Sequence, residues 1–392
     1  MKYITRSVWV LSLVSLLTDT ASEMLYPVMP VYLKTIGFSV VLIGILEGMA
    51  EATAGLSKGY FGKLSDTSGR RAVFVQFGYA FSAVSKPMMA VFVYPLWVFF
   101  VRTIDRIGKG IRTGARDAIL SEEATPQTKA KIFGFHRSMD TLGAVIGPSL
   151  ALVYLYFHPH EYKTLFFIAF LPGVLAIGAS LMLKEKNKPR SDTKRTVSFF
   201  SFLHYWKDSS VSYKKLVSGI LAFTLINSSD VFLLLKAKES GLSDSSVIGI
   251  YIFYNLVYAL FGFPVGILAD KVGLKKIFIA GLLIFSTVYF GMAYYTGLIP
   301  FLVSFFLYGI YAASTEGISK AWISNIVDKK DMATAIGTFT GMQSICTMLA
   351  STLTGIIWFQ FGATTAFTIT ATITLVIVTY FILVIPKPLM IN

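Results

Sequence analysis

The chain has 392 residues, of which 55% are hydrophobic and only 14% are charged. A soluble globular domain carries about 25% charged residues, so the composition excludes an ordinary soluble protein and indicates one embedded in a lipid bilayer. The net charge of +14 does not indicate nucleic acid, because the basic residues fall in alternate connections between apolar stretches.

Apolar stretches long enough to cross a bilayer, which takes about 20 residues, recur along the whole chain. The predicted spans before a central polar segment are 7–33, 41–61, 73–94, 96–117, 132–156 and 164–183. The predicted spans after it are 214–237, 243–264, 276–296, 299–322, 333–357 and 363–385. The sequence therefore predicts an all-α membrane protein with twelve transmembrane helices in two pseudo-symmetric six-helix halves.

The polar segment is a linker at 184–213, which separates an N-terminal half at 1–183 from a C-terminal half at 214–392. Short basic loops stay in the cytoplasm, so we expect both termini and the linker there, and the chain as a monomer in the inner membrane. The aromatic stretch at 199–206 is either a short amphipathic helix on the inner surface or a packed loop. Acidic residues interrupt the first apolar run, so we expect a retained helix rather than a signal peptide.

A loop motif is repeated in the two halves. Residues 62–71 return as 266–275, and Asp66 corresponds to Asp270 at an offset of 204 positions. Parallel repeats of this kind place a binding site between the halves. The pattern G-x-x-x-D-x-x-G with basic residues after it, between the second and third spans of each half, resembles the major facilitator superfamily. The resemblance covers the whole chain and implies a solute transporter that works by rocker-switch alternating access.

The repeated loops are the expected gate. Glycine suits a tight turn because it accepts positive φ, and Asp66 is placed to cap a helix N-terminus. We expect Arg70 to pair with Asp117; in the family such a network holds the halves together while the transporter is open outward. The alternative is a solvated loop whose charges set topology. Leu274 replaces the first arginine in the second copy, so we expect a weaker network there. The expected gating residues are Gly62, Asp66, Gly69, Arg70, Gly266, Asp270 and Gly273 of these loops, Asp117 at the end of the fourth span, and Gly143, Gly147 and Pro148 of the fifth.

Ionisable side chains inside spans are costly, so they are candidate functional groups. They either neutralise one another in pairs, as we expect for Asp105, Asp117 and Arg137, or they bind protons and substrate. Neighbours four residues apart share a helix face. The expected substrate-binding residues are Arg102, Arg106, Glu47, Glu51, His136, Asp140, Asn227, Asp230, Glu316 and Lys320.

Glu23 stands four residues before a P-x-x-P sequence that runs from Pro27 to Pro30. This arrangement resembles the first span of twelve-span drug:proton antiporters, in which the acid faces the central cavity and exchanges its proton against substrate. The resemblance implies Glu23 as the proton-coupling residue, with Asp19 as its companion one turn away. The alternative is that Arg102 or Arg106 neutralises Glu23.

The fifth span contains Gly143, Gly147 and Pro148, which resemble the G-x-x-x-G-P motif of exporters. Small residues let helices approach closely, and we expect this bend at the interface between the halves. Arg102 occupies the place of the fourth-span arginine of superfamily exporters. The additional cation of Arg106 favours an anionic or zwitterionic substrate.

These features predict a proton-coupled antiporter that performs efflux of a small amphipathic molecule, such as a drug-like compound or a siderophore-like metabolite. The alternative is an importer or facilitator of a small anionic nutrient. We expect no enzymatic activity, cofactor or metal site, because the sequence has no recognisable nucleophile–base pair or nucleotide-binding motif, and its few histidines lack supporting ligands.

Overall fold

The computed structural model describes residues 4–26, 28–29, 32–33, 36–38, 40–159, 161–184 and 201–385. The helices of the first part of the chain are α1 (Arg6–Leu25), α3 (Val40–Ser68), α4 (Arg71–Val91), α5 (Pro95–Glu122), α6 (Lys129–Phe157), α7 (Tyr162–Ser180) and α8 (Ser201–Asp208). Those that follow are α9 (Val211–Thr224), α10 (Val231–Glu239), α11 (Asp244–Val272), α12 (Leu274–Tyr294), α13 (Leu298–Asn325), the 3-10 turn η1 (Lys329–Asp331) and α14 (Met332–Val384).

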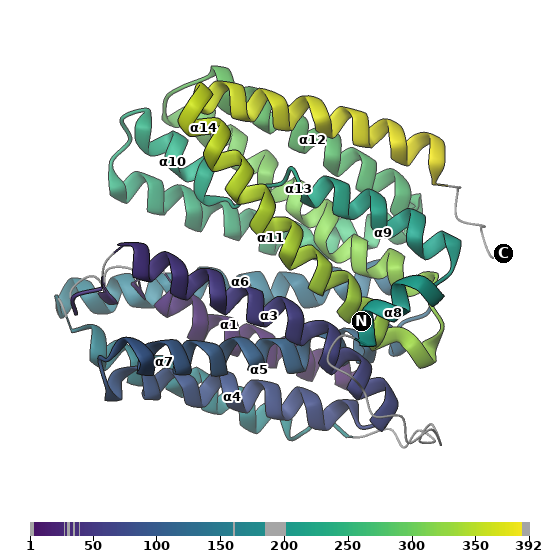
Figure 1. The fold of residues 1–392 in the computed structure, drawn as a ribbon, viewed down its shortest axis with the longest axis horizontal. Coiled ribbons are helices and arrows are strands. Elements are labelled where there is room, and N and C mark those ends of the chain that lie inside the picture. The colour runs from purple at the N-terminus through teal and green to yellow at the C-terminus, as the bar shows by residue number, and fades with distance from the viewer. Residues whose placement is uncertain are drawn as a thin grey trace. The chain divides into compact units, whose positions relative to one another are not determined.

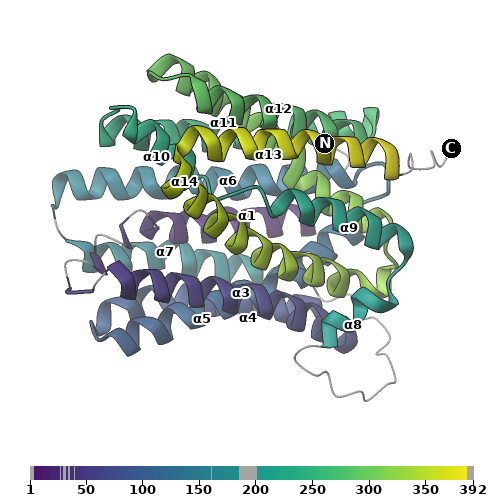
Figure 2. The ribbon, with the colours of Figure 1, turned by 45° about the horizontal axis from the view of Figure 1, so that its top comes forward.

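The described helices confirm the predicted all-α membrane fold. Seven of them are long and apolar enough to cross a bilayer. Two differences from the predicted spans are informative. The last two spans are joined in α14, which turns at Gly362, where φ is 83°, and both views show the bend (Figures 1 and 2). The seventh span is broken between α9 and α10.

Contacts divide the chain into two compact units that are not continuous in sequence. Unit 1 consists of residues 1–124, 139–208 and 327–344. In it, α5 packs between α3 and α4, and α7 packs against α1 and α4, as Figure 1 shows. One part of its apolar core gathers Met24, Tyr32 and Phe166 from three separate segments. This packing holds the polar faces of α1 and α5 in place.

Unit 2 consists of residues 125–138, 209–326 and 345–392. In it, α13 packs against both α11 and α12. Its core is rich in aromatic rings, such as Phe285 and Tyr289, whose centroids lie 4.2 Å apart. Helices α6 and α14 each contribute residues to both units. The predicted halves and linker, with boundaries at 183 and 214, stay a prediction.

Candidate functional site

The first loop repeat is the centre of a polar network in unit 1. The carboxylate of Asp66 accepts hydrogen bonds from the backbone N–H of Thr334 at 2.7 Å and from its hydroxyl at 2.9 Å. Arg71 forms ion pairs with Asp66 and Glu122, and donates to the carbonyl of Lys329 at 3.2 Å. We call these five residues the Asp66 network. It joins the end of α3 to α5 and to the N-terminus of α14, where a negative charge is favourable.

The expected ion pair between Arg70 and Asp117 is not formed, and the gating role of Arg70 stays a prediction. Arg70 is exposed and its described contact is a backbone hydrogen bond to Ser68 at 3.4 Å, whereas Arg71 begins α4 and turns inward. Asp117 pairs instead with Arg116, with Nε and Oδ1 2.9 Å apart. Arg70 is the non-helical N-cap of α4 and Arg71 is its first helical residue, so the two side chains have different surroundings.

The glycines of the repeat have two different functions. Gly69 makes the turn, with φ of 68°. Gly62, which we expected in the turn, lies inside α3, where a Cβ would stand 2.5 Å from the carbonyl oxygen of Ala333. Gly266 has the same position in α11, where a Cβ would stand 2.5 Å from the carbonyl oxygen of Ala130. The absence of a side chain therefore allows α3 to contact α14, and α11 to contact α6.

The second loop repeat forms a simpler network in unit 2. Asp270 accepts hydrogen bonds from the backbone N–H groups of Ala130 at 3.0 Å and Lys131 at 2.9 Å, at the N-terminus of α6. We call these three residues the Asp270 network. No arginine reaches Asp270 in the part of the chain that the structure describes. Lys275, which corresponds to Arg71, donates to the carbonyls of Ile382 and Ile385.

The aromatic stretch after the linker is helical where the structure describes it, and forms α8. This short helix contacts α3 within unit 1. Its Tyr205 is half-buried, and burial together with the nearby carboxylates of Asp331 and Asp328 raises the pKa of the Tyr205 phenol above its usual range. The helix thus packs beside the Asp66 network.

Buried carboxyl groups lie together on α1 and α6 in unit 1. Asp19 lies beside Asp140, with Glu23 and Lys109 close to it. The hydroxyl of Ser15 donates to Asp140 and lies 3.5 Å from Arg116, which pairs with Asp117. We call Asp19, Glu23 and Asp140 the acid cluster. Sequence reasoning identified these acids but missed Ser15 and Arg116, which connect them to α5.

The cations of α5 lie among partners from α4. Lys86 pairs with Asp105 at 2.9 Å, and Arg102 and Arg106 lie close to the same pair. Arg112 lies over the ring of Tyr79, 4.5 Å from its centroid. The expected pairing of Asp105 and Asp117 is thus confirmed, although both partners, Lys86 and Arg116, were not foreseen.

The G-x-x-x-G-P motif of α6 contacts α1 within unit 1. A Cβ on Gly143 would lie 2.5 Å from the carbonyl oxygen of Leu16, and one on Gly147 would lie 2.5 Å from that of Thr20. We had expected these glycines at an interface between the halves. The structure shows that they let α6 approach the backbone of α1 on either side of Asp19.

The charged and polar residues expected in the second half lie among aromatic rings in unit 2. Arg137 pairs with Glu316 at 2.5 Å and donates to the hydroxyl of Tyr258 at 2.7 Å. Asn227 donates to Tyr311 at 2.9 Å, and Tyr308 donates to Asp230 at 2.6 Å. The tyrosines were not predicted as a group, because they come from separate helices.

The remaining expected residues are placed as follows. His136 is buried on α6 in unit 2, whereas Asp140 on the same helix belongs to unit 1. Lys320 is partly buried on α13. Glu47 and Glu51 are part of α3, and their side chains lie outside what the structure describes, as do Pro27 and Pro30.

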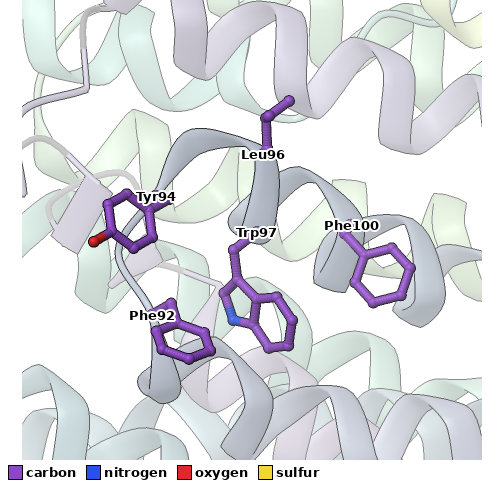
Figure 3. A pocket seen from close by; sticks show the side chains of 5 residues that line it. All are labelled: Phe92, Tyr94, Leu96, Trp97 and Phe100. Atoms are coloured by element: carbon purple, nitrogen blue, oxygen red, sulfur yellow. The ribbon is translucent and has the colours of Figure 1, made fainter.

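A shallow apolar pocket lies where α4 leads into α5 (Figure 3). Its lining is Phe92, Tyr94, Leu96, Trp97 and Phe100. Most of these side chains are exposed, and none carries a charge. Exposed aromatic rings at the end of a span are typical of the membrane interface, so this pocket is not a candidate for binding a charged substrate.

Comparison with known proteins gives consistent results over the full chain. Residues 11–253 and 216–390 match the profile of the Major Facilitator Superfamily. An uncharacterised MFS-type transporter of Methanocaldococcus jannaschii is 32% identical over 361 residues, which cover 91% of this chain and 89% of that protein.

Solved transporters share the fold at low sequence identity. The human organic anion transporter MFSD10 superimposes with a TM-score of 0.79 at 15% identity, covering 96% of this chain and 99% of that one. The Escherichia coli fucose:proton symporter FucP gives 0.79 at 14% identity, with 97% and 98% covered.

Proposed function

Because the chain belongs to the major facilitator superfamily, we propose that it is a proton-coupled antiporter that exports a small amphipathic, zwitterionic or anionic molecule. Membership makes it a multi-pass membrane protein and a non-enzymatic carrier of small molecules. The proposal adds the coupling ion, the direction and the site. It also includes a monomer in the inner membrane with both termini in the cytoplasm.

The acid cluster is the observation on which proton coupling rests. Asp19 lies beside Asp140, and Glu23 is close on the same face of α1. Two adjacent carboxylates repel each other, so such a pair favours holding a proton. The nearby cation of Lys109 favours the charged form, which allows the proton to be released. A cluster of this composition is suited to load and unload protons in each cycle.

The expected cycle follows from this chemistry. Protonation of Glu23 and Asp19 from outside removes their negative charge and releases the substrate. Deprotonation inside restores the charge and resets the site. The Asp66 and Asp270 networks serve as the gate, since each joins a repeated loop to the N-terminus of a helix from the other half of the sequence. Export is supported by the resemblance of Gly143, Gly147 and Pro148 to the exporter motif.

A second candidate is an importer or facilitator of a small anionic nutrient. The cations of α5 favour it, because Arg102 and Arg106 outnumber the single Asp105 beside them. One structural relative is an organic anion transporter and another is a fucose:proton symporter. This candidate predicts uptake into cells and loss of binding in Arg106→Ala.

Efflux from cells that express the full chain tests the proposal. The probes are ethidium, norfloxacin and 2,3-dihydroxybenzoate, each followed with an intact proton gradient and after a protonophore collapses it. We expect gradient-dependent efflux of at least one probe, which Glu23→Gln abolishes while insertion and folding are kept. Glu239→Gln is the control, because Glu239 is exposed at the end of α10.

The outcomes separate the two candidates. Efflux by Glu23→Gln at the wild-type rate removes Glu23 from the mechanism. Gradient-dependent uptake of the anionic probe, without efflux of any probe, favours the importer instead. Efflux that persists after the gradient collapses contradicts proton coupling.

A further inference from the structure

The seventh span is interrupted where its polar residues lie. Helix α9 ends at Thr224 and α10 begins at Val231, with turn and coil between them. Non-helical backbone at membrane depth occurs where protein or water, not lipid, surrounds it. In transporters built from repeats, such breaks form substrate sites. The break in unit 2 places Asn227, Ser228 and Asp230 on irregular backbone.

Asp230 places a carboxylate at the break in the seventh span. Its Oδ1 accepts a hydrogen bond from Tyr308 at 2.6 Å, and it makes no ion pair with a described residue. Although it stands at the N-cap of α10, its side chain makes no capping bond. The charge of Arg137 is close enough to act on the Asp230 carboxylate, but the Arg137 guanidinium forms its ion pair with Glu316. An intramembrane carboxylate of this kind normally has a partner or a function.

Aromatic rings from three helices gather around Asp230. Tyr254 of α11 and Tyr308 of α13 have centroids 5.1 Å apart, and Tyr308 lies 5.2 Å from Tyr311. Tyr289 of α12 is also close to Asp230. The faces of such rings attract cations, so they add to the attraction of the carboxylate.

Three buried polar atoms of the same region have no hydrogen-bond partner among the described residues. They are Oδ1 of Asn227, Oγ of Ser228 and the hydroxyl of Tyr289. Ser228 is 3% exposed and Tyr289 is 0% exposed, and the side chains of Ser228 and Tyr308 lie within hydrogen-bonding reach of the Tyr289 hydroxyl. Buried polar groups are nearly always paired. All three atoms can accept a hydrogen bond from a ligand that carries N–H groups, and the two hydroxyls can also donate one.

We propose that these residues bind a protonated amine of the transported substrate. We call the set the Asp230 site, consisting of Asn227, Ser228, Asp230, Tyr254, Tyr289 and Tyr308. The carboxylate supplies the charge, the rings stabilise the cation, and the unpaired acceptors receive N–H groups. The inference rests on the proposed function, because it names a chemical group of the substrate that the transporter carries.

The chemical groups of the Asp230 site distinguish an amine from other ligands. A metal ion needs several acidic, histidine or cysteine ligands, and the described residues contain no group of three or more placed to hold one. An anion finds no unpaired positive charge here, since Arg137 is engaged by Glu316. A quaternary ammonium has charge but no N–H, so it leaves the acceptors unpaired.

Equilibrium binding to the purified full chain in lipid nanodiscs tests the proposal, without any proton gradient. The probes are 2-phenylethylamine, its N,N,N-trimethyl derivative and 2-phenylethanol, followed by calorimetry and by the rise in unfolding temperature that a bound ligand causes. We expect the primary amine to bind best, the trimethyl compound more weakly, and the neutral alcohol not at all.

Three variants locate the site. Asp230→Asn removes the charge and is expected to weaken amine binding by about tenfold or more. Tyr289→Phe keeps the ring and removes only the unpaired hydroxyl, so it is expected to weaken amine binding about threefold and leave the trimethyl compound unaffected. Tyr294→Phe, at the exposed end of α12, is the control and keeps wild-type binding.

Several outcomes overturn the proposal: no binding of the amine, equal binding of amine and alcohol, or wild-type binding in either Asp230→Asn or Tyr289→Phe. If Tyr289→Phe stabilises the fold without changing binding, the unpaired hydroxyl belongs to packing alone and the proposal fails. A failure of proton coupling is separate, because it shows in the Glu23→Gln efflux assay and not in binding. Amine binding with wild-type efflux by Glu23→Gln keeps this inference and removes only the coupling.

Discussion

Asp66 and Asp270 occupy equivalent positions in the two loop repeats, and each binds the N-terminus of a helix from the other half of the sequence. Asp66 binds Thr334 of α14 through backbone and hydroxyl, and Asp270 binds the backbone of Ala130 and Lys131 in α6. In both copies a glycine four residues before the aspartate, Gly62 or Gly266, lets the two helices approach closely enough for this contact. The difference is Arg71, which adds two ion pairs to the first network alone.

This comparison separates the common part of the gate from the part that differs. The common part is an aspartate whose carboxylate accepts hydrogen bonds from backbone N–H groups at a helix N-terminus. This interaction needs no second side chain. The part that differs is the arginine, which pairs with two carboxylates in the first copy. In the second copy, Leu274 and Lys275 stand at the positions of Arg70 and Arg71. The Asp66 network is therefore expected to contribute more to stability than the Asp270 network.

Removing the arginine should have the largest effect. Arg71→Ala leaves Asp66 and Glu122 buried without their cation, so we expect the free energy of unfolding in mixed micelles to fall by about 3–5 kcal/mol. Lys275→Ala removes the hydrogen bonds to the carbonyls of Ile382 and Ile385 and should cost about 1 kcal/mol. Arg70→Ala is the matched control and should leave stability unchanged, because Arg70 is exposed. Equal losses at positions 71 and 275 would contradict the asymmetry of the two networks.

Filling the glycine positions should affect both copies alike. Gly62→Ala and Gly266→Ala each place a Cβ 2.5 Å from a backbone oxygen, so we expect losses of about 1–3 kcal/mol from overpacking. Gly178→Ala in α7 is the control, because a Cβ there meets no atom within 4 Å. Unfolding of the three variants under identical conditions measures the change in the free energy of unfolding. Helix propensity alone would make each Gly→Ala change stabilising, so a loss at Gly178 as large as at the other two would show that close approach does not set the result.

Removing one hydroxyl should have the smallest effect and is confined to the first network. Thr334→Val loses the side-chain bond to Asp66 and keeps the backbone bond, so we expect a loss of about 1 kcal/mol. Thr334→Ser should restore stability, and the exposed Thr372→Val should not change it. The same unfolding measurement checks all three. If Thr334→Ser is as unstable as Thr334→Val, the hydroxyl bond is not the cause.

The sequence predicted the repeat, the spans and most of the charged candidates, because periodicity and offset are visible without a structure. It identified Asp66 as a helix cap but predicted an ion pair between Arg70 and Asp117. The structure instead pairs Arg71 with Asp66 and Glu122. The start of α4 at Arg71 decides which of the two adjacent arginines points inward, and composition does not fix a helix boundary to one residue.

The seventh span shows a second limit. Hydropathy predicted one helix over 214–237, and the break between α9 and α10 was missed. The run Asn227, Ser228, Ser229 and Asp230 was the available signal, since such residues compete with helical hydrogen bonds. The partners Tyr289 and Tyr308 were beyond prediction because they lie 59 and 78 positions after Asp230 in the chain.

The sequence by itself determined the membrane class, the helices, the pseudo-repeat and the family, because apolar length and repeated motifs depend on local composition. Only the tertiary structure decided which charges pair, such as Lys86 with Asp105, and that Asp230 stands among tyrosines. Pairing is set by distances of a few ångströms between side chains from different helices, and the order of residues along the chain does not specify those distances.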